Sequence, residues 1–324
     1  MSIIKLDNLI KKFGNFTAVG GVSFAVYPGE IFGFLGPNGA GKSTTIKILA
    51  TLLKPTSGQA ELAGFDVVSQ PTQVRQSIGM VFQDPSLDNR LTADENLFFH
   101  ALLYNVPKSL RSERMDQVLR IVDLTDRRKE IVKTFSGGMK RRLEIARGLL
   151  HHPKVLFLDE PTVGLDPQTR NAIWEHVHKL RDEIGITVFM TTHYMDEAEN
   201  CDRIAIIDKG LIRAVDTPAN LKRTLGGDMV IIKGDPELKE DLAVRYGLEV
   251  KETAEGYFFM VPIGAEFVPQ VVSDFPGRIK AIQVKEPSLD DVFLSLTGRA
   301  IREEVGSAKD IMRDRMRSRR RRVR

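Results

Sequence analysis

The residues with the clearest chemistry form one glycine-rich segment near the start of the chain, with the pattern G-x-x-x-x-G-K-S/T. The segment comprises Gly36, Pro37, Asn38, Gly39, Ala40, Gly41, Lys42, Ser43 and Thr44. Glycines let the backbone wrap closely around a phosphate chain, and N–H groups at a helix start favour its negative charge. In this pattern the lysine reaches the terminal phosphates and the next hydroxyl can bind Mg²⁺. A glycine-rich turn without a ligand is the alternative interpretation.

Two adjacent carboxylates form the second candidate. Asp159 and Glu160 directly follow the apolar run 155–158, which is typical of a buried strand. Such strands deliver residues to a ligand at their carboxyl ends. We expect Asp159 to hold Mg²⁺ directly or through water, and Glu160 to act as general base on an attacking water. Taken alone, an Asp-Glu pair after a strand is more often a solvated turn, so the phosphate loop is needed for this interpretation.

A third segment, Ser136-Gly137-Gly138, precedes the expected helix 139–150. It combines a hydroxyl with free N–H groups at a helix start, which suits a second phosphate contact. Taken alone, the segment is more simply explained as an N-cap.

The elements that must position these residues are predicted from hydrophobic patterning. Short apolar strands at 3–6, 22–26 and 31–35 alternate with turns and lead into the phosphate loop. Apolar runs at 155–158 and 187–190 each follow a helix-like segment, as buried parallel strands do. We therefore predict an α/β domain at 1–225. A stretch with helical periodicity, at about 85–150, is predicted to be a helical insertion in it.

The pattern changes after residue 225. Strands are predicted at 229–233, 248–251, 257–261 and 279–284, and helices at 237–246 and 267–275. The resulting order βαββαβ predicts a small ferredoxin-like α+β domain at 226–300. The remaining segment, 301–324, is rich in arginine and has few apolar residues to bury, so we predict a disordered tail.

Composition restricts the class of protein. Hydrophobic residues make up 42% of the chain and charged residues 28%, as in ordinary globular proteins. No run approaches the roughly 20 apolar residues that a membrane-spanning helix needs, and we see no secretory signal, so we expect a cytosolic chain. The one cysteine, Cys201, fits a reducing compartment. Eight arginines and one aspartate give 313–324 a charge of +7, so the net charge of +4 leaves −3 for the rest. The basic pI therefore does not indicate a nucleic-acid-binding surface.

Taken in order, these residues resemble the ATP-binding cassette (ABC) family over about 3–225. The resemblance implies a P-loop NTPase fold with a helical subdomain, and ATP and Mg²⁺ as ligands. In it, 36–44 is the Walker A loop and 136–138 is the signature. Asp159 and Glu160 are then the Walker B acids, and 163–166, which ends at Asp166, is the D-loop.

Three further residues are assigned only through the resemblance. Phe13 would stack on adenine, Gln83 would link Mg²⁺ to the membrane partner, and His193 would contact the γ-phosphate as the switch histidine. Two positions depart from the usual family pattern. Phe13 stands where Tyr is usual and keeps the aromatic face. Met139 stands where the signature usually has Gln, so the hydrogen bonds of that amide are lost.

Within the family, 286–299 resembles the closing segment of daunorubicin-resistance-type exporter subunits. The resemblance implies an ATP-hydrolysing subunit that pairs with a second ABC subunit around two ATP molecules. That subunit could be a different chain, but we expect a second copy of this one, because every expected catalytic residue is present. The pair would act at the cytoplasmic face of the cell membrane and drive a separate permease that exports a drug or a lipid- or glycan-like compound.

Other interpretations are weaker. A soluble ABC ATPase acting on ribosomes or nucleic acid usually carries two cassettes or a long coiled coil, and this chain shows neither. The pairs His151-His152 and His176-x-His178 lack acidic or cysteine partners at ligand spacing, which argues against a metal site. The arginine tail could contact anionic lipid, bind RNA non-specifically, or be inert. We expect no specific nucleic-acid partner.

Overall fold

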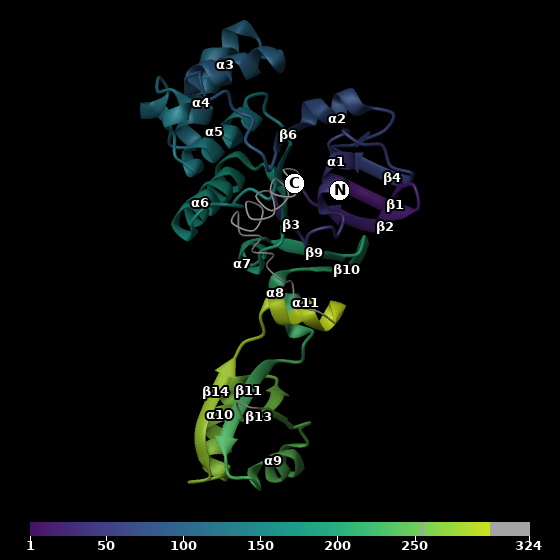
Figure 1. Cartoon of the computed structure of the whole chain (residues 1–324), viewed down its shortest axis with the longest axis vertical. Coiled ribbons are helices and arrows are strands. Elements are labelled where there is room, and N and C mark those ends of the chain that lie inside the picture. The colour runs from purple at the N-terminus through teal and green to yellow at the C-terminus, as the bar shows by residue number, and fades with distance from the viewer. Residues whose placement is uncertain (254–255, 299–324) are drawn as a thin grey trace, which may run out of the picture.

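The computed structural model describes residues 1–253 and 256–298 (Figure 1). The larger body carries all elements up to α8 (Pro218–Arg223), and a smaller domain made of β11 to β14 extends below it. Within these described ranges, no helix is both long enough and apolar enough to span a bilayer.

A six-stranded sheet forms the centre of the body and is parallel except at β10. Its strands are β3 (Ile31–Leu35), β6 (Ile78–Val81), β7 (Val155–Asp159), β8 (Thr187–Thr192), β9 (Arg203–Asp208) and β10 (Leu211–Asp216), in the order β10-β9-β3-β8-β7-β6. Every residue of β3, β7 and β8 is buried, because helices and a second sheet cover the two faces. The predicted α/β fold is confirmed. Residues after β3 and β7 emerge at the same sheet edge, where the phosphate loop and the two acids lie.

A four-stranded antiparallel sheet packs beside the central one. It contains β1 (Ile4–Phe13), β2 (Phe16–Val26), β4 (Ser57–Leu62) and β5 (Phe65–Asp66), with α1 (Lys42–Leu49) and α2 (Pro71–Ser77) nearby. Phe24 joins the two sheets by stacking on Phe32 with ring centroids 5.2 Å apart. The strands predicted at 3–6 and 22–26 are only parts of β1 and β2, which form one long hairpin.

Three helices form the predicted insertion. They are α3 (Ala93–Leu103), α4 (Arg111–Ile121) and α5 (Gly137–Leu149), joined through short 3₁₀ turns at Lys108–Leu110, Thr125–Arg127 and Val132–Thr134. Helix α3 begins with a capping box in which Thr92 and Glu95 satisfy each other's backbone N–H groups. Helix α6 (Pro167–Ile184) and the insertion share one continuous hydrophobic core with the central sheet. The insertion is therefore attached to the sheet by packing as well as by the chain.

The small domain has the predicted βαββαβ order. Its elements are β11 (Asp228–Gly234), α9 (Leu238–Tyr246), β12 (Lys251–Thr253), β13 (Gly256–Val261), α10 (Gly264–Asp274) and β14 (Ile279–Lys285). The antiparallel strand order β12-β13-β11-β14 is that of a ferredoxin-like sheet. The domain has its own hydrophobic core. The only clear difference is that the strand predicted at 248–251 begins at Lys251.

The last described helix, α11 (Leu289–Thr297), returns to the body. It packs on α8 and on α7 (Met195–Ala198), and its Leu289, Val292 and Phe293 are buried in the core of the body. This packing corrects the predicted boundary, which assigned the helix to the small domain at 226–300. The cause is tertiary, because the apolar side of α11 is covered by α7 and α8. The predicted tail, 301–324, lies outside the described residues.

Candidate active site

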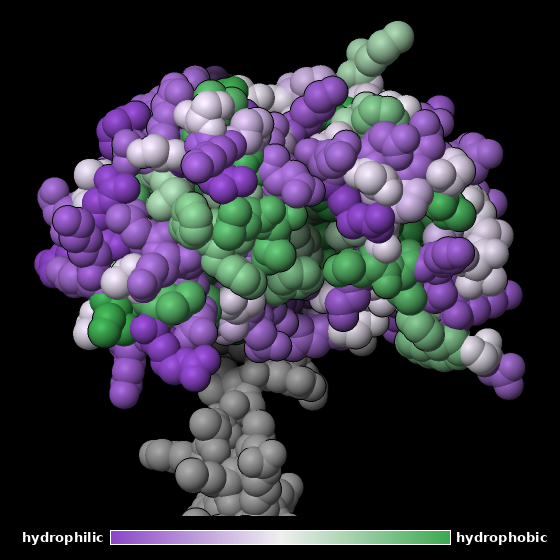
Figure 2. Space-filling model, turned by 90° about the horizontal axis from the view of Figure 1, so that it is seen from above, coloured by the Kyte–Doolittle hydropathy of each residue, from purple (hydrophilic) through white to green (hydrophobic). Residues whose placement is uncertain are grey.

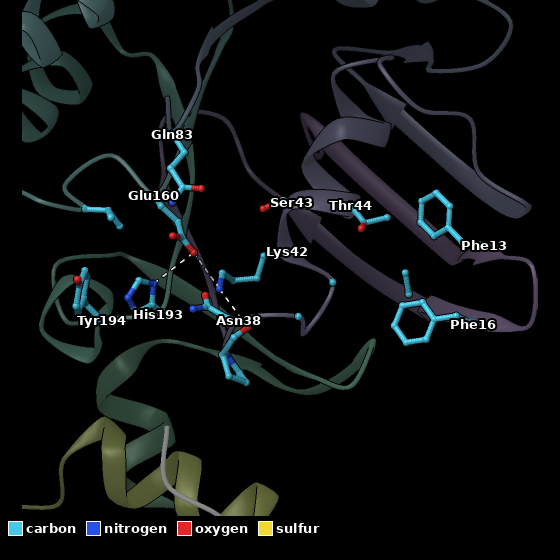
Figure 3. A pocket seen from close by; sticks show the side chains of 15 residues that line it. Phe13, Phe16, Asn38, Lys42, Ser43, Thr44, Gln83, Glu160, His193 and Tyr194 are labelled. Carbon is cyan, nitrogen blue, oxygen red and sulfur yellow. Dashed lines mark hydrogen bonds and ion pairs between the residues drawn. The ribbon is translucent and has the colours of Figure 1, made fainter. Parts of the chain in front are cut away.

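One cavity of about 570 Å³ contains most of the residues that the sequence singled out (Figure 3). The predicted residues that line it are Phe13, Pro37, Asn38, Gly39, Gly41, Lys42, Ser43, Thr44, Gln83, Glu160 and His193. Figure 3 shows Glu160 between Gln83 and His193 on one side of the cavity, with Lys42 reaching toward it and Phe13 at the far end. The cavity therefore joins the ends of β3 and β7 to the tip of the β1–β2 hairpin.

Two glycines of the loop are required by close backbone contacts. A Cβ atom at Gly36 would lie 2.3 Å from the carbonyl oxygen of Ile207, and one at Gly41 would lie 2.5 Å from that of Ala18. Gly41 also has a φ of +108°, which side chains disfavour. Helix α1 then begins at Lys42 without a side-chain cap and without acidic residues in its first turn. Its uncapped N–H groups suit an anion.

The lysine of the loop is buried and fully engaged. Lys42 Nζ donates to the carbonyl oxygens of Gly36 at 2.7 Å and Pro37 at 3.3 Å, and lies 3.2 Å from Glu160 Oε1. Burial lowers the pKa of Lys42, although the charge of Glu160 opposes that shift. A buried ammonium within reach of the loop interior is the group expected to meet a phosphate.

Glu160 is held in a specific conformation at the end of β7. Its Oε1 lies 3.3 Å from His193 Nδ1 as well as near Lys42. Burial alone would raise the pKa of Glu160, but His193 and Lys42 outweigh that effect, so the pKa lies below its usual value. Its φ of +47° is in the left-handed region, and its N–H donates to Thr191. The carboxylate is therefore ionised at neutral pH and fixed at the cavity.

The residues predicted to hold Mg²⁺ are a hydroxyl, an amide and one carboxylate. Ser43 and Gln83 line the cavity, and Asp159 lies behind it, where its Oδ1 accepts a 2.6 Å hydrogen bond from Thr191 Oγ1. Among the described residues, no group of three His, Cys, Asp or Glu could hold a metal. Mg²⁺ bound beside phosphate uses one or two carboxylates and keeps several waters, so the oxygen donors of Ser43, Gln83 and Asp159 are of the right chemical type for it.

Other predicted residues lie away from this cavity. Ser136 caps α5 by accepting from Met139 N–H at 3.2 Å, and Asp166 caps α6 by accepting from Thr169 N–H at 3.0 Å. A Cβ on Gly138 would meet the Thr169 methyl at 2.5 Å, so the two helix starts are neighbours. Ser136, Gly137, Gly138 and Asp166 therefore lie close together, but none of them lines the cavity of its own chain.

The cavity also contains aromatic residues that sequence reasoning missed. Phe16 is 63% exposed and pairs with Phe13 across the β1–β2 hairpin. Tyr194 lies against His193 with ring centroids 4.1 Å apart, and the Arg170 guanidinium lies 4.4 Å above the Tyr194 ring. Two signals in the sequence could have identified these residues: Phe16 is an aromatic residue three positions after Phe13, and Tyr194 directly follows His193.

A buried acid, Glu197, lies behind His193. The hydroxyls of Thr162 and Thr192 both donate to its carboxylate, the second at 2.5 Å. Burial raises the pKa of Glu197 to about 7, while Thr192 and the charges of Arg170 and His193 counteract part of this shift. Glu197 therefore joins the segment after Glu160 to the segment before His193.

We predict that Glu197 makes stability depend on pH. Because its pKa is about 7 when folded and near 4.5 when unfolded, the folded state binds the extra proton between these values. Glu197 therefore adds at most about 3 kcal/mol to the free energy of unfolding. This contribution is complete below pH 4.5 and is lost as the pH rises through 7. Glu197→Gln should remove this loss. Unfolding midpoints followed by the fluorescence of the single tryptophan, Trp174, at pH 5 and 8 would test it, since Trp174 is buried in the body. Equal pH dependence in parent and variant would contradict the assignment.

Comparison with known proteins identifies the family of this chain. A family model described as "ABC transporter" matches residues 19–163. The chain is 41% identical over 312 residues to the linearmycin resistance ATP-binding protein LnrL of Bacillus subtilis (strain 168), covering 93% of this chain and 100% of LnrL. It is 38% identical over 306 residues to the daunorubicin/doxorubicin resistance ATP-binding protein DrrA of Streptomyces peucetius, covering 91% and 92% of the two chains.

Solved structures give the same result. The chain is similar to cbiO1 from Clostridium perfringens, part of the ABC transporter complex cbiONQ, with a TM-score of 0.64 at 28% identity, over 76% of this chain and 96% of that one. It is also similar to the dimeric ATP-binding cassette MJ0796 bound to ADP and Pi, with a TM-score of 0.59 at 30% identity, over 66% and 98%. These similar proteins are transporter subunits and ATP-binding cassettes rather than ribosomal regulators.

Proposed function

This chain belongs to the ATP-binding subunits of ABC transporters, and on that premise we propose which of its residues bind ATP, hydrolyse it and contact the partners. It is an ATP-hydrolysing subunit, and such subunits work as dimers with a separate membrane permease. The observation that carries the site assignment is the contact of Lys42 and His193 with one oxygen of Glu160 inside the cavity of Figure 3.

We propose that ATP lies along the cavity, from the phosphate loop to the tip of the β1–β2 hairpin. The phosphates meet Lys42 and the first N–H groups of α1. Ser43, Gln83 and, directly or through water, Asp159 would hold Mg²⁺, which would neutralise phosphate charge. The adenine stacks on Phe13, which is 50% exposed and open to a planar ligand. Phe16, beside it in the hairpin, extends the apolar surface.

Glu160 is the proposed general base. Its carboxylate accepts a proton from the attacking water, and His193 fixes the carboxylate and the terminal phosphate relative to each other. The phosphates compete with Glu160 for the Lys42 ammonium, because both are anions within its reach. Binding of ATP thus releases the Glu160 oxygen that Lys42 holds, which leaves the carboxylate able to accept the proton.

A second copy is proposed to complete each site. Ser136 and Gly137 are exposed at a helix start outside their own cavity, next to Asp166, and Gly138 follows them as a buried residue. N–H groups and a hydroxyl at a helix start suit a phosphate, so we assign them to the ATP bound by the partner chain. Because the ligand bridges two chains, ATP affinity and dimer formation are thermodynamically linked.

The permease is proposed to dock on α3. Four large apolar side chains of this helix are between 42% and 58% exposed: Phe98, Phe99, Leu102 and Leu103. Figure 2 views the body from above, the side on which α3 lies in Figure 1, and shows a hydrophobic patch surrounded by polar residues. A neighbouring hollow of about 540 Å³ continues from Leu103 and Tyr104 to Arg75 and Arg114. Such a patch with a polar rim suits a protein partner.

The cargo is proposed from the relatives. LnrL and DrrA are named for resistance to linearmycin and to daunorubicin and doxorubicin, so we infer export of a drug. A lipid- or glycan-like cargo is the alternative. We propose that the chain lies at the cytoplasmic face of the membrane, bound to its permease. Contact of the arginine tail with anionic lipid remains a prediction.

We predict that Phe99→Asp separates docking from catalysis. A carboxylate in the α3 patch disfavours burial against an apolar partner, so recovery of the tagged chain with membranes should fall at least tenfold. Hydrolysis of Mg²⁺-ATP by the purified chain should stay within about twofold, because Phe99 does not line the cavity. Val244→Asp is the matched control, since Val244 is exposed on the small domain.

The material recovered with the parent chain decides between the functions. A multi-span membrane protein supports the transporter assignment, and its loss with Phe99→Asp places it on α3. Equal recovery with both variants would contradict docking on α3. Recovery of ribosomes instead of a membrane protein would contradict the permease.

A further inference from the structure

Helix α5 carries a buried arginine that reaches the loop of Glu160. Arg141 is 6% exposed and lies five residues after Ser136. Its carboxylate partner, Glu144, is 1% exposed and lies 3.0 Å from Arg141 Nη1. Burial lowers the pKa of Arg141, and Glu144 opposes that shift. An arginine stays protonated even when its pKa is lowered, so Arg141 is a buried cation beside the loop of Glu160.

The guanidinium donates to backbone carbonyls of two separate segments. Nε donates to Pro161 at 2.6 Å, and Nη2 lies 3.3 Å from the carbonyl oxygens of both Asp159 and Glu160. Nη1 donates to Phe82, the residue before Gln83, at 2.5 Å. The planar guanidinium has fixed donor directions, so it holds the carbonyls of 159–161 and the carbonyl of Phe82 in one arrangement.

Glu160 needs this support because its backbone is strained. Its φ of +47° costs on the order of 1 to 2 kcal/mol for a residue with a side chain, and such conformations persist only when neighbours fix them. Thr191 holds the N–H of Glu160, and Arg141 holds its carbonyl. Removing one support should let the carboxylate move away from the reacting water.

We propose that Arg141 is a positioning residue for ATP hydrolysis, which fixes Glu160 and the segment of Gln83 relative to helix α5. The proposal rests on Glu160 being the general base. Arg141 does not line the cavity, so it acts through the backbone of other residues. Because Ser136 is the N-cap of α5, movement of that helix start against a second copy is transmitted to Glu160 and Gln83 through the side chain of Arg141.

The test is Arg141→Lys in the full-length chain. Lysine keeps the charge next to Glu144 but cannot hold four carbonyls in the directions of the guanidinium fork. We expect kcat for Mg²⁺-ATP to fall about 10- to 100-fold, as misplacement of a catalytic group by about 1 Å does, with KM for ATP within about threefold. Arg147→Lys is the matched control, because Arg147 is equally buried on α5 and bonds to Ser86 instead. Its kcat should stay within about threefold.

A second pair of measurements excludes a general loss of structure. The Arg141→Gln and Glu144→Gln double variant removes both buried charges together, so it keeps the fold accessible if lysine does not fit. It should show the same loss of kcat. In a Glu160→Gln background, Arg141→Lys should add no further loss, because both changes act on one step.

The outcomes separate this inference from the assignment of the base. An unchanged kcat in Arg141→Lys, an equal loss in Arg147→Lys, or a loss that adds to that of Glu160→Gln would overturn the role of Arg141. Normal turnover in Glu160→Gln alone would instead overturn the general base, whatever Arg141→Lys does.

Discussion

Glu160→Gln should lower the turnover of ATP by about 10³-fold while ATP binding is retained, because a positioned general base contributes about 10² to 10⁴ in rate. Glutamine keeps the size of the side chain and its contact with His193, but it cannot accept the proton of water. It also removes the negative charge 3.2 Å from Lys42, so the phosphates no longer compete for that ammonium. Affinity for ATP should therefore be equal to or higher than that of the parent chain.

The measurement is steady-state release of phosphate together with binding of a fluorescent ATP analogue. Glu199→Gln is a suitable control, since Glu199 is an exposed acid that pairs with Lys222 outside the cavity. Turnover above about a tenth of the parent rate would contradict the assignment of Glu160 as base. A loss of both binding and turnover would instead indicate that Glu160 supports the structure of the loop.

Lys42→Ala should fail at an earlier step. The change removes the ammonium that the phosphate loop holds by the carbonyls of Gly36 and Pro37, so the terminal phosphates lose their buried cation. Loss of one preorganised donor in such a site costs about 10² to 10³ in rate, and here we also expect ATP affinity to fall at least tenfold.

Lys47→Ala is the control for this change, because Lys47 lies on the same helix α1 but is exposed. Binding and turnover are measured as for Glu160→Gln, and Trp174 fluorescence checks that the body remains folded. If Lys42→Ala bound ATP and hydrolysed it like the parent, the loop of 36–44 would not be the phosphate site.

The contrast between the phosphate loop and Arg141 shows what the sequence can predict. The loop is a local pattern whose glycines, lysine and following helix are adjacent in the chain, so residue order alone indicated its chemistry. Arg141 contacts Phe82, 59 positions away, and the carbonyls of 159–161. Those contacts exist only after β6, β7 and α5 have packed together, and no local pattern contains them.

The same reason explains the other differences. Phe16 enters the cavity because the β1–β2 register pairs it with Phe13. Helix α11 has an apolar side that the sequence shows, but the choice between α7 and the small domain is made by tertiary packing. The predicted fold class was thus correct, whereas the bounds of several elements and the contacts between distant segments required the structure.

The central claim is that ATP closes two copies of this chain around the site of Glu160. Its most direct test is the mass in solution of the purified Glu160→Gln chain, measured by light scattering with and without ATP at concentrations that saturate binding. We predict the mass of one chain, 36.3 kDa, without ATP and twice that mass with ATP, reversed when ATP is removed. A single-chain mass at saturating ATP would contradict the account, because the surface of Ser136 and Asp166 would then have no ligand to bind.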